Sequence, residues 1–95
     1  MYGTIFNLKP KLGKKEALID SLKDQPASAE GGVAWFVMNP DSEGDLIAIA
    51  IFKDKESYRV NAEKPETHEN FIKMMKYLDE EPSWKDGTFV IGDIV

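Results

Sequence analysis

The sequence predicts a small α+β domain in which a four-stranded antiparallel sheet carries helices on one face. Segments with the alternation or β-branching of strands and segments with the periodicity of helices succeed one another in the order strand, helix, strand, strand, helix, strand. The chain has 95 residues, which is room for one domain. No linker or low-complexity tract divides it, so residues 1–95 are expected to form a single domain.

The first strand and helix are predicted from the first quarter of the chain. The run Tyr2–Leu8 is rich in β-formers and predicts a strand. Leu18 and Leu22 lie four residues apart with lysines around them, which predicts an amphipathic helix with one apolar stripe. Gln25-Pro26 is expected to end this helix, and a loop of small residues follows over 27–32.

Two strands joined as a hairpin come next. They are predicted over Val33–Asn39 and Asp45–Phe52, and the segment 40–44 between them is dense in turn-forming residues. The strand Asp45–Phe52 is apolar on both of its faces. A strand of this kind is expected to be covered on both sides.

The second half predicts two further helices and a last strand. Asp54 is a good N-cap for a short helix that holds Tyr58, and Pro65 suits the first turn of a longer one. The longer helix has an apolar stripe at the spacing i, i+3, i+4, i+7, formed by Phe71, Met74, Met75 and Leu78. The β-branched run Thr88–Val95 predicts the final strand.

The two crossover units fit a ferredoxin-like βαββαβ arrangement, with helices on one face of the sheet. The opposite face then has no cover from its own chain, although the strand Asp45–Phe52 is apolar on that side too. Packing against the sheet of a second copy is the simplest way to cover it. We therefore expect a homodimer.

Composition excludes several classes of function. The net charge is −5, from 17 acidic and 12 basic residues, which opposes binding to nucleic acid or to an anionic membrane surface. There is no cysteine and one histidine, so thiolate chemistry and a metal site built on several histidines are excluded. Without a signal peptide or an apolar run of about 18 residues, a cytoplasmic protein is expected.

Four segments resemble the antibiotic biosynthesis monooxygenase (ABM) family of the dimeric α/β-barrel superfamily. They are Leu8–Leu18, Phe52–Tyr58, Glu66–Phe71 and Glu81–Trp84, and together they span nearly the whole chain. The resemblance implies two sheets that close into a barrel across a dimer, with a pocket between helices and sheet in each subunit. Relatives include oxygenases of polyphenols that use no metal or flavin, haem-degrading enzymes, and proteins without a known reaction.

His68 and Asn7 are the candidate catalytic residues. His68 lies three residues before Phe71, in line with an apolar helix stripe, and an imidazole can remove a phenolic proton near neutral pH. Its alternative is a partly exposed residue of the first helical turn. Asn7 is the polar residue between Ile5 and Leu8, and its amide needs partners that a ligand could supply. Its alternative is a structural residue at the end of a strand.

An aromatic-binding pocket is predicted from large apolar side chains, with plain core packing as the alternative for each of them. They are Trp35, Phe36, Phe52, Tyr58 and Met75. Trp84 is expected to fix the start of the last strand. The haem-degrading relatives carry a tryptophan near the position of Asn61, where this chain offers Tyr58 or Val60.

Three functions remain open at this point. The first is a monooxygenase that needs no cofactor and acts on a small aromatic or quinol-like compound, with His68 as base and Asn7 orienting the substrate or an oxygen intermediate. The second is a non-catalytic dimer that binds a small apolar ligand or serves a stress response. The third is haem degradation.

Overall fold

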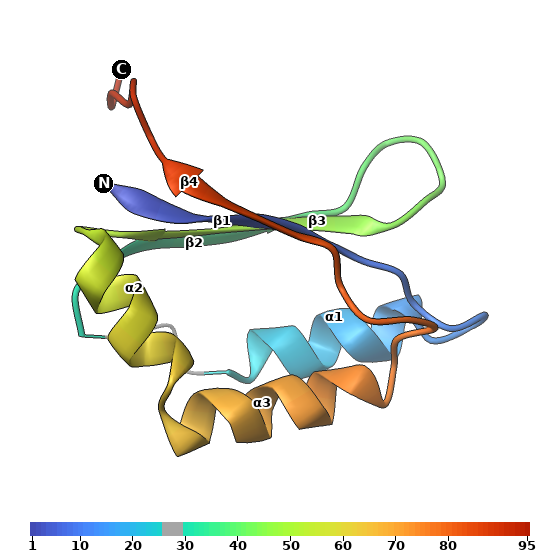
Figure 1. Ribbon diagram of the computed structural model, residues 1–95. Helices are drawn as coiled ribbons and strands as arrows, with labels where there is room; N and C mark the ends of the chain where they lie inside the picture. The colour runs from blue at the N-terminus through green and yellow to red at the C-terminus, as the bar shows by residue number, and fades with distance from the viewer. Residues whose placement is uncertain (26–29) are drawn as a thin grey trace.

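The computed structural model describes residues 1–25 and 30–95, which form a sheet and a layer of helices (Figure 1). The strands are β1 (Tyr2–Leu8), β2 (Gly32–Met38), β3 (Leu46–Phe52) and β4 (Trp84–Thr88). The helices are α1 (Lys15–Lys23), α2 (Lys55–Ala62) and α3 (Pro65–Met75). The predicted helix end at Pro26 and the start of the predicted loop, residues 27–29, lie outside the described residues.

The sheet is antiparallel throughout, with the strand order β2-β3-β1-β4. The two central strands are β1 and β3. They pair along their whole length, from Tyr2 with Phe52 to Leu8 with Leu46. All three helices lie on one side of the sheet (Figure 1). The predicted ferredoxin-like α+β architecture is therefore confirmed.

Both helices of the second half begin where the sequence predicts. Asp54 caps α2, because its carboxylate accepts a hydrogen bond from the backbone N–H of Ser57 at 2.8 Å. The same bond is the main reason why the pKa of Asp54 lies below its usual value. Pro65 opens α3, where the N–H that proline lacks would have no helical partner.

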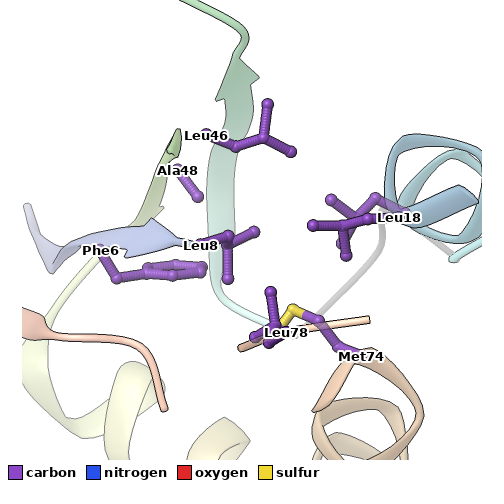
Figure 2. Packing of buried hydrophobic residues seen from close by; sticks show 8 residues of the cluster. Phe6, Leu8, Leu18, Leu46, Ala48, Met74 and Leu78 are labelled. Carbon is purple, nitrogen blue, oxygen red and sulfur yellow. The ribbon is translucent and has the colours of Figure 1, made fainter. Parts of the chain in front are cut away.

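The hydrophobic core lies between the sheet and the helices (Figure 2). Leu8 of β1, Leu18 of α1 and Leu46 of β3 are completely buried and meet there. Each buried side chain of this size contributes roughly 1.5–3 kcal/mol to the free energy of unfolding. The remaining members of the cluster come from β1, β3, α1, α3 and the segment after α3: Phe6, Leu22, Ala48, Met74 and Leu78.

The other side of the sheet, which we call the outer sheet face, is apolar and lacks a helix (Figure 1). Its side chains are identified by cross-strand pairing, because paired residues share a face. The side chain of Phe36 is 63% exposed and that of Met38 53%. On the more central strands the exposure is lower, at 40% for Ile47 of β3 and 44% for Ile5 of β1. The face comprises Ile5, Ala34, Phe36, Met38, Ile47, Ile49 and Ile51. The expectation that the chain leaves one apolar face uncovered agrees with these exposures.

The last strand differs from the prediction. A strand was expected over Thr88–Val95, but β4 is Trp84–Thr88, and residues 90–95 belong to no strand. The segment 84–88 is poor in β-formers and is held by pairing with β1, from Trp84 opposite Phe6 to Thr88 opposite Tyr2. After Phe89, whose N–H donates to the carbonyl of Met1 at 2.9 Å, no described strand lies beside the chain. Tertiary pairing here outweighs local β propensity.

Candidate functional site

A pocket of about 880 Å³ lies between the sheet and the helices α2 and α3. Its size is typical of sites for small organic molecules. Six aromatic side chains line it, from β1, β2, β3, α2, α3 and β4: Phe6, Trp35, Phe52, Tyr58, Phe71 and Trp84. Nine polar or charged residues also line it: Thr4, Gln25, Glu30, Asn61, Lys64, Glu66, Thr67, His68 and Asn70. A wall with six aromatic rings can hold a flat aromatic ligand, and the polar side chains can fix its orientation.

The ring of Trp84 packs in tilted contacts against two other aromatic rings of the wall. The ring of Trp84 lies with its centroid 4.2 Å from that of Phe6 and 6.3 Å from that of Phe71. These contacts join β4, β1 and α3. They hold the wall in a defined shape, because aromatic pairs at such separations attract one another beyond simple burial.

His68 lines this pocket from the end of the first turn of α3. It was predicted to face inward; the structure gives it an exposed side chain, so it lies where the pocket meets solvent. Within the described residues, no side-chain hydrogen bond orients its imidazole. Both ring nitrogens are thus left for a ligand or for water.

Tyr58 brings a second titratable group to the pocket. Its hydroxyl donates a hydrogen bond to the carboxylate of Asp86 at 3.1 Å, and its ring lies at 5.4 Å from that of Tyr2 and 5.6 Å from that of Phe52. Partial burial, followed by the bond to Asp86, raises the pKa of Tyr58 to about 12. Tyr58 therefore stays protonated at neutral pH, and its oxygen keeps a lone pair with which to accept a hydrogen bond.

Thr4 is the one polar side chain among the described residues that is fully buried, at 2% exposure, and it also lines the pocket. Its hydroxyl donates to the carbonyl of Lys85 at 3.2 Å. This bond links β1 to β4 from the pocket side. Thr4 thus presents an oxygen to the pocket without leaving a buried donor unpaired.

Asn7 is placed away from the pocket. Side chains alternate along a strand, so Phe6 and Leu8 point into the core and Asn7 points to the opposite face. Its amide nitrogen donates to the Asp45 carboxylate and its amide oxygen accepts from the N–H of Ser83, both at 2.8 Å. The structure thus gives Asn7 partners of its own, which ties the end of β1 to the segments before β3 and β4.

No protein-family model and no curated protein sequence matches the chain, but several solved structures have a similar fold. A protein of Nitrosomonas europaea described as a "putative antibiotic biosynthesis monooxygenase" superposes with a TM-score of 0.82 at 14% identity, over 96% of this chain and 100% of that one. One of Chloroflexus aurantiacus with the same description gives 0.71 at 20% identity, over 96% of both chains. The chain therefore shares the fold of these two proteins.

A third similar structure bears on assembly. It is a protein of Bacteroides fragilis, described as dimeric, of unknown function and with a ferredoxin-like fold, and it superposes with a TM-score of 0.69 at 18% identity over 93% of this chain and 95% of that one. Identities this low establish a common fold. The family resemblance noted in the sequence is thereby supported through the structure.

Within this fold, the predicted pocket walls divide into two groups. Trp35, Phe52 and Tyr58 line the pocket. Phe36 instead belongs to the outer sheet face, and Met75 packs against the core while its neighbour Met74 lines the pocket. Adjacent residues point in different directions on a strand or helix, so a shift of one position decides which of them meets a ligand.

The pocket contains residues that were missed as ligand contacts. Trp84 and Phe71 had been assigned to packing, and Thr4 had not been singled out at all. The signal for Thr4 was its place two residues before Phe6, on the same face of a strand. Trp84 could not be placed in this way, because its position depends on the pairing of β4 with β1.

Two other findings concern ligands and membranes. In the part of the chain that the structure describes, no three His, Cys, Asp or Glu side chains gather in a way that could hold a metal ion. Over the same residues, no helix has the length and hydropathy needed to cross a bilayer.

Proposed function

We propose that this protein is a monooxygenase that needs no metal or flavin and oxidises a small aromatic or quinol-like compound in the pocket between the sheet and α2–α3, acting as a homodimer. The observation that carries the proposal is that His68, the sole imidazole of the chain, lines an aromatic pocket of about 880 Å³. Similar structures described as antibiotic biosynthesis monooxygenases support the same class of reaction.

The proposed chemistry starts with removal of a proton. A neutral imidazole takes the proton from a phenol or from an activated CH₂ group of an anthrone, and this leaves an electron-rich carbanion or phenolate. For an anthrone, the CH₂ group reacts with O₂ to give C=O and water, so the substrate itself supplies the electrons that reduce the second oxygen atom. The aromatic wall holds the ring, and the hydroxyl oxygen of Tyr58, which is part of that wall, can accept a hydrogen bond from a substrate hydroxyl.

Oxygen consumption tests this proposal. The wild type is compared with His68→Ala on a panel of hydroquinones and anthrones. Loss of a positioned base is expected to lower kcat/KM by about 10²–10⁴-fold. Glu69→Ala is the matched control, since Glu69 is exposed on the same helix and is not part of the pocket lining. Equal rates for wild type and His68→Ala would remove His68 from the mechanism.

A non-catalytic binding protein is the second candidate, and one observation favours it. The His68 side chain is exposed and has no orienting hydrogen bond among the described residues. Catalytic bases are commonly held by a second group. A ligand thermal-shift screen distinguishes the two candidates: a compound that raises Tm without consuming oxygen supports binding alone.

Haem degradation is the weakest of the three functions predicted from the sequence. Haem carries two propionates, and the described part of the pocket lining has one basic side chain, Lys64, beside the acidic Glu30 and Glu66. His68 is the residue that could ligate the iron. Titration with micromolar haem checks this function directly, since absence of a Soret shift ends it.

The catalytic role predicted for Asn7 stays a prediction. Its two hydrogen bonds to Asp45 and Ser83 account for its polar side chain without a ligand. We therefore assign no step to Asn7 in the proposed reaction.

A further inference from the structure

Two hydroxyl groups of the pocket wall lie together where β1, β4 and α2 meet. Thr4 of β1 is paired with Asp86 of β4, so the two side chains lie on the same face of the sheet. Tyr58 of α2 reaches the same Asp86 with its hydroxyl. Burial and then Asp86 raise the pKa of Tyr58, and a hydrogen bond from the Thr4 hydroxyl opposes them. We call Thr4 and Tyr58, which both line the pocket, the hydroxyl pair.

Neither member of the hydroxyl pair has a proton left for a ligand. The Tyr58 proton is donated to the carboxylate of Asp86. The single proton of Thr4 is donated to the carbonyl of Lys85, or to the Tyr58 oxygen when the hydroxyl turns toward it. In both cases the two oxygens offer lone pairs only. At this end, the pocket accepts hydrogen bonds from a ligand and does not donate them.

Two neighbours of the hydroxyl pair bear on this polarity. Asp86 adds a negative charge behind Tyr58 and is itself an acceptor only. Asn61 lies three residues after Tyr58 on α2, which is one helical turn, and it also lines the pocket. Its amide can donate as well as accept, so it fits a ligand of either polarity. Selection by polarity therefore rests with the hydroxyl pair.

We propose that the hydroxyl pair is a subsite for a hydroxyl group of the aromatic ligand, and that it makes the pocket select phenols and hydroquinones over the matching quinones and ethers. A ligand hydroxyl donates its proton to the Tyr58 oxygen, which a ligand reaches first because Thr4 is 2% exposed. A quinone carbonyl or an ether oxygen at the same place sets lone pairs against lone pairs, and both groups lose water without gaining a bond. A site of this polarity rejects ligands that lack the proton.

The subsite also separates two roles within one ligand. A ligand hydroxyl beside Tyr58 stays protonated, because the negative charge of Asp86 disfavours a phenolate next to it. The proton that His68 removes in the proposed reaction therefore comes from another position of the ligand. The selection rests on the proposed function, since it takes the ligand to be aromatic and to bind in this pocket, but it acts in binding and needs no turnover.

Binding of three compounds with the same ring system tests the subsite. Naphthohydroquinone, its dimethyl ether and naphthoquinone are titrated into the protein without oxygen, by isothermal titration calorimetry. The wild type is expected to bind the hydroquinone at least about tenfold more tightly than either of the other two. Equal dissociation constants for the three compounds overturn the subsite.

Tyr58→Phe keeps the ring and removes the oxygen. Its preference for the hydroquinone over the dimethyl ether is expected to fall to within about threefold, because the main acceptor is gone. Tyr77→Phe is the matched control, since Tyr77 packs against the core and is not part of this pocket's lining. It is expected to keep the preference of the wild type. Circular dichroism checks that both variants are folded, and a Tyr58→Phe protein that keeps the full preference contradicts the subsite.

Asp86→Asn changes the polarity and keeps both hydroxyls. The amide can donate to the Tyr58 oxygen, which frees the tyrosine proton for a ligand carbonyl. Naphthoquinone is then expected to bind at least about threefold more tightly than it binds to the wild type. A bond that serves structure alone would instead change the affinities of all three compounds in parallel, and that result overturns the subsite.

Failure of the subsite and failure of the proposed function are distinguishable. His68→Ala is expected to keep the preference for the hydroquinone, because binding needs no base; its loss would move the selection from Tyr58 to His68 and overturn the subsite. A wild type that consumes oxygen with an anthrone but does not distinguish the three compounds also overturns the subsite, and it leaves the proposed function standing. A wild type that distinguishes them without consuming oxygen supports the subsite and contradicts the monooxygenase.

Discussion

The hydroxyl of Tyr58 on α2 donates a hydrogen bond to the carboxylate of Asp86 on β4 at 3.1 Å. The two residues are 28 positions apart, and no pattern in the sequence connects them. Their contact ties a helix that borders the pocket to the edge of the sheet. Burial first and this hydrogen bond second raise the pKa of Tyr58 to about 12, so a protonated tyrosine stands in the wall of the proposed ligand site.

Titration of Tyr58 is the first prediction. Its pKa rises from 10.0 to about 12, chiefly because burial disfavours the phenolate, and then because of the hydrogen bond to Asp86. The protonated form is favoured in the folded state. The stabilisation is therefore complete below pH 10 and is lost as the pH rises toward 12. Urea unfolding of wild type and Tyr58→Phe at several alkaline pH values is expected to show the steeper loss in the wild type.

Asp86→Asn separates the two causes. It removes the charge and leaves burial, so the pKa of Tyr58 is expected to fall but to stay above 10.0. The phenolate absorbance of wild type minus that of Tyr58→Phe reports the pKa of Tyr58 directly. A difference titration centred at or below 10.0 in the wild type contradicts the raised pKa.

Removal of the Asn7 side chain is the second prediction. Asn7→Ala removes the hydrogen bonds to the Ser83 N–H and the Asp45 carboxylate, which lie at or near the surface, and we expect a loss of about 0.5–1.5 kcal/mol in the free energy of unfolding. Urea denaturation measures it, with the exposed Asn39→Ala as control at within about 0.5 kcal/mol. A variant that keeps full stability but loses oxygen consumption would return Asn7 to a catalytic role.

A charge on the outer sheet face is the third prediction. Phe36→Lys puts an ammonium group on the face that we propose to pack against a second copy, at a position that is 63% exposed in the single chain. The protein is expected to remain folded and to become monomeric at micromolar concentration, because an unpaired charge in an apolar interface is costly. Light scattering after gel filtration measures the mass.

Ile72→Lys is its matched control. Ile72 is 51% exposed on α3, away from the outer sheet face, and the same change there is expected to leave the mass unaltered. Equal masses for wild type and Phe36→Lys contradict the proposed packing of sheet on sheet.

Truncation of a core leucine is the fourth prediction. Leu8 is completely buried between β3 and the helices, and Leu8→Ala is expected to cost about 2–5 kcal/mol in the free energy of unfolding. Leu12→Ala, at a fully exposed leucine, is expected to change it by less than about 0.5 kcal/mol. Thermal or urea unfolding measures both, and similar losses for the two variants contradict the assigned core.

The order of elements, most of their bounds and the Asp54 cap were open to prediction because local chemistry decides them. The helix stripe with Leu18 and Leu22 and the apolar run of Asp45–Phe52 carry their own periodicity. The apolar outer sheet face was also predictable, because the strand Asp45–Phe52 carries apolar residues on both of its faces. The bounds of the last strand were predicted wrongly, because they depend on the pairing of β4 with β1 and not on local β propensity.

The sequence by itself determined the fold class, the presence of an uncovered apolar face and the aromatic character of the pocket. Tertiary structure decided which residues meet in that pocket. The pairing of Trp84 with Phe6 brought β4 into register and turned Trp84 toward the ligand space, while alternation along β1 turned Asn7 away from it and Thr4 into it. Periodicity assigns residues to faces, but long-range strand pairing decides which faces come together, and no short stretch of sequence encodes that choice.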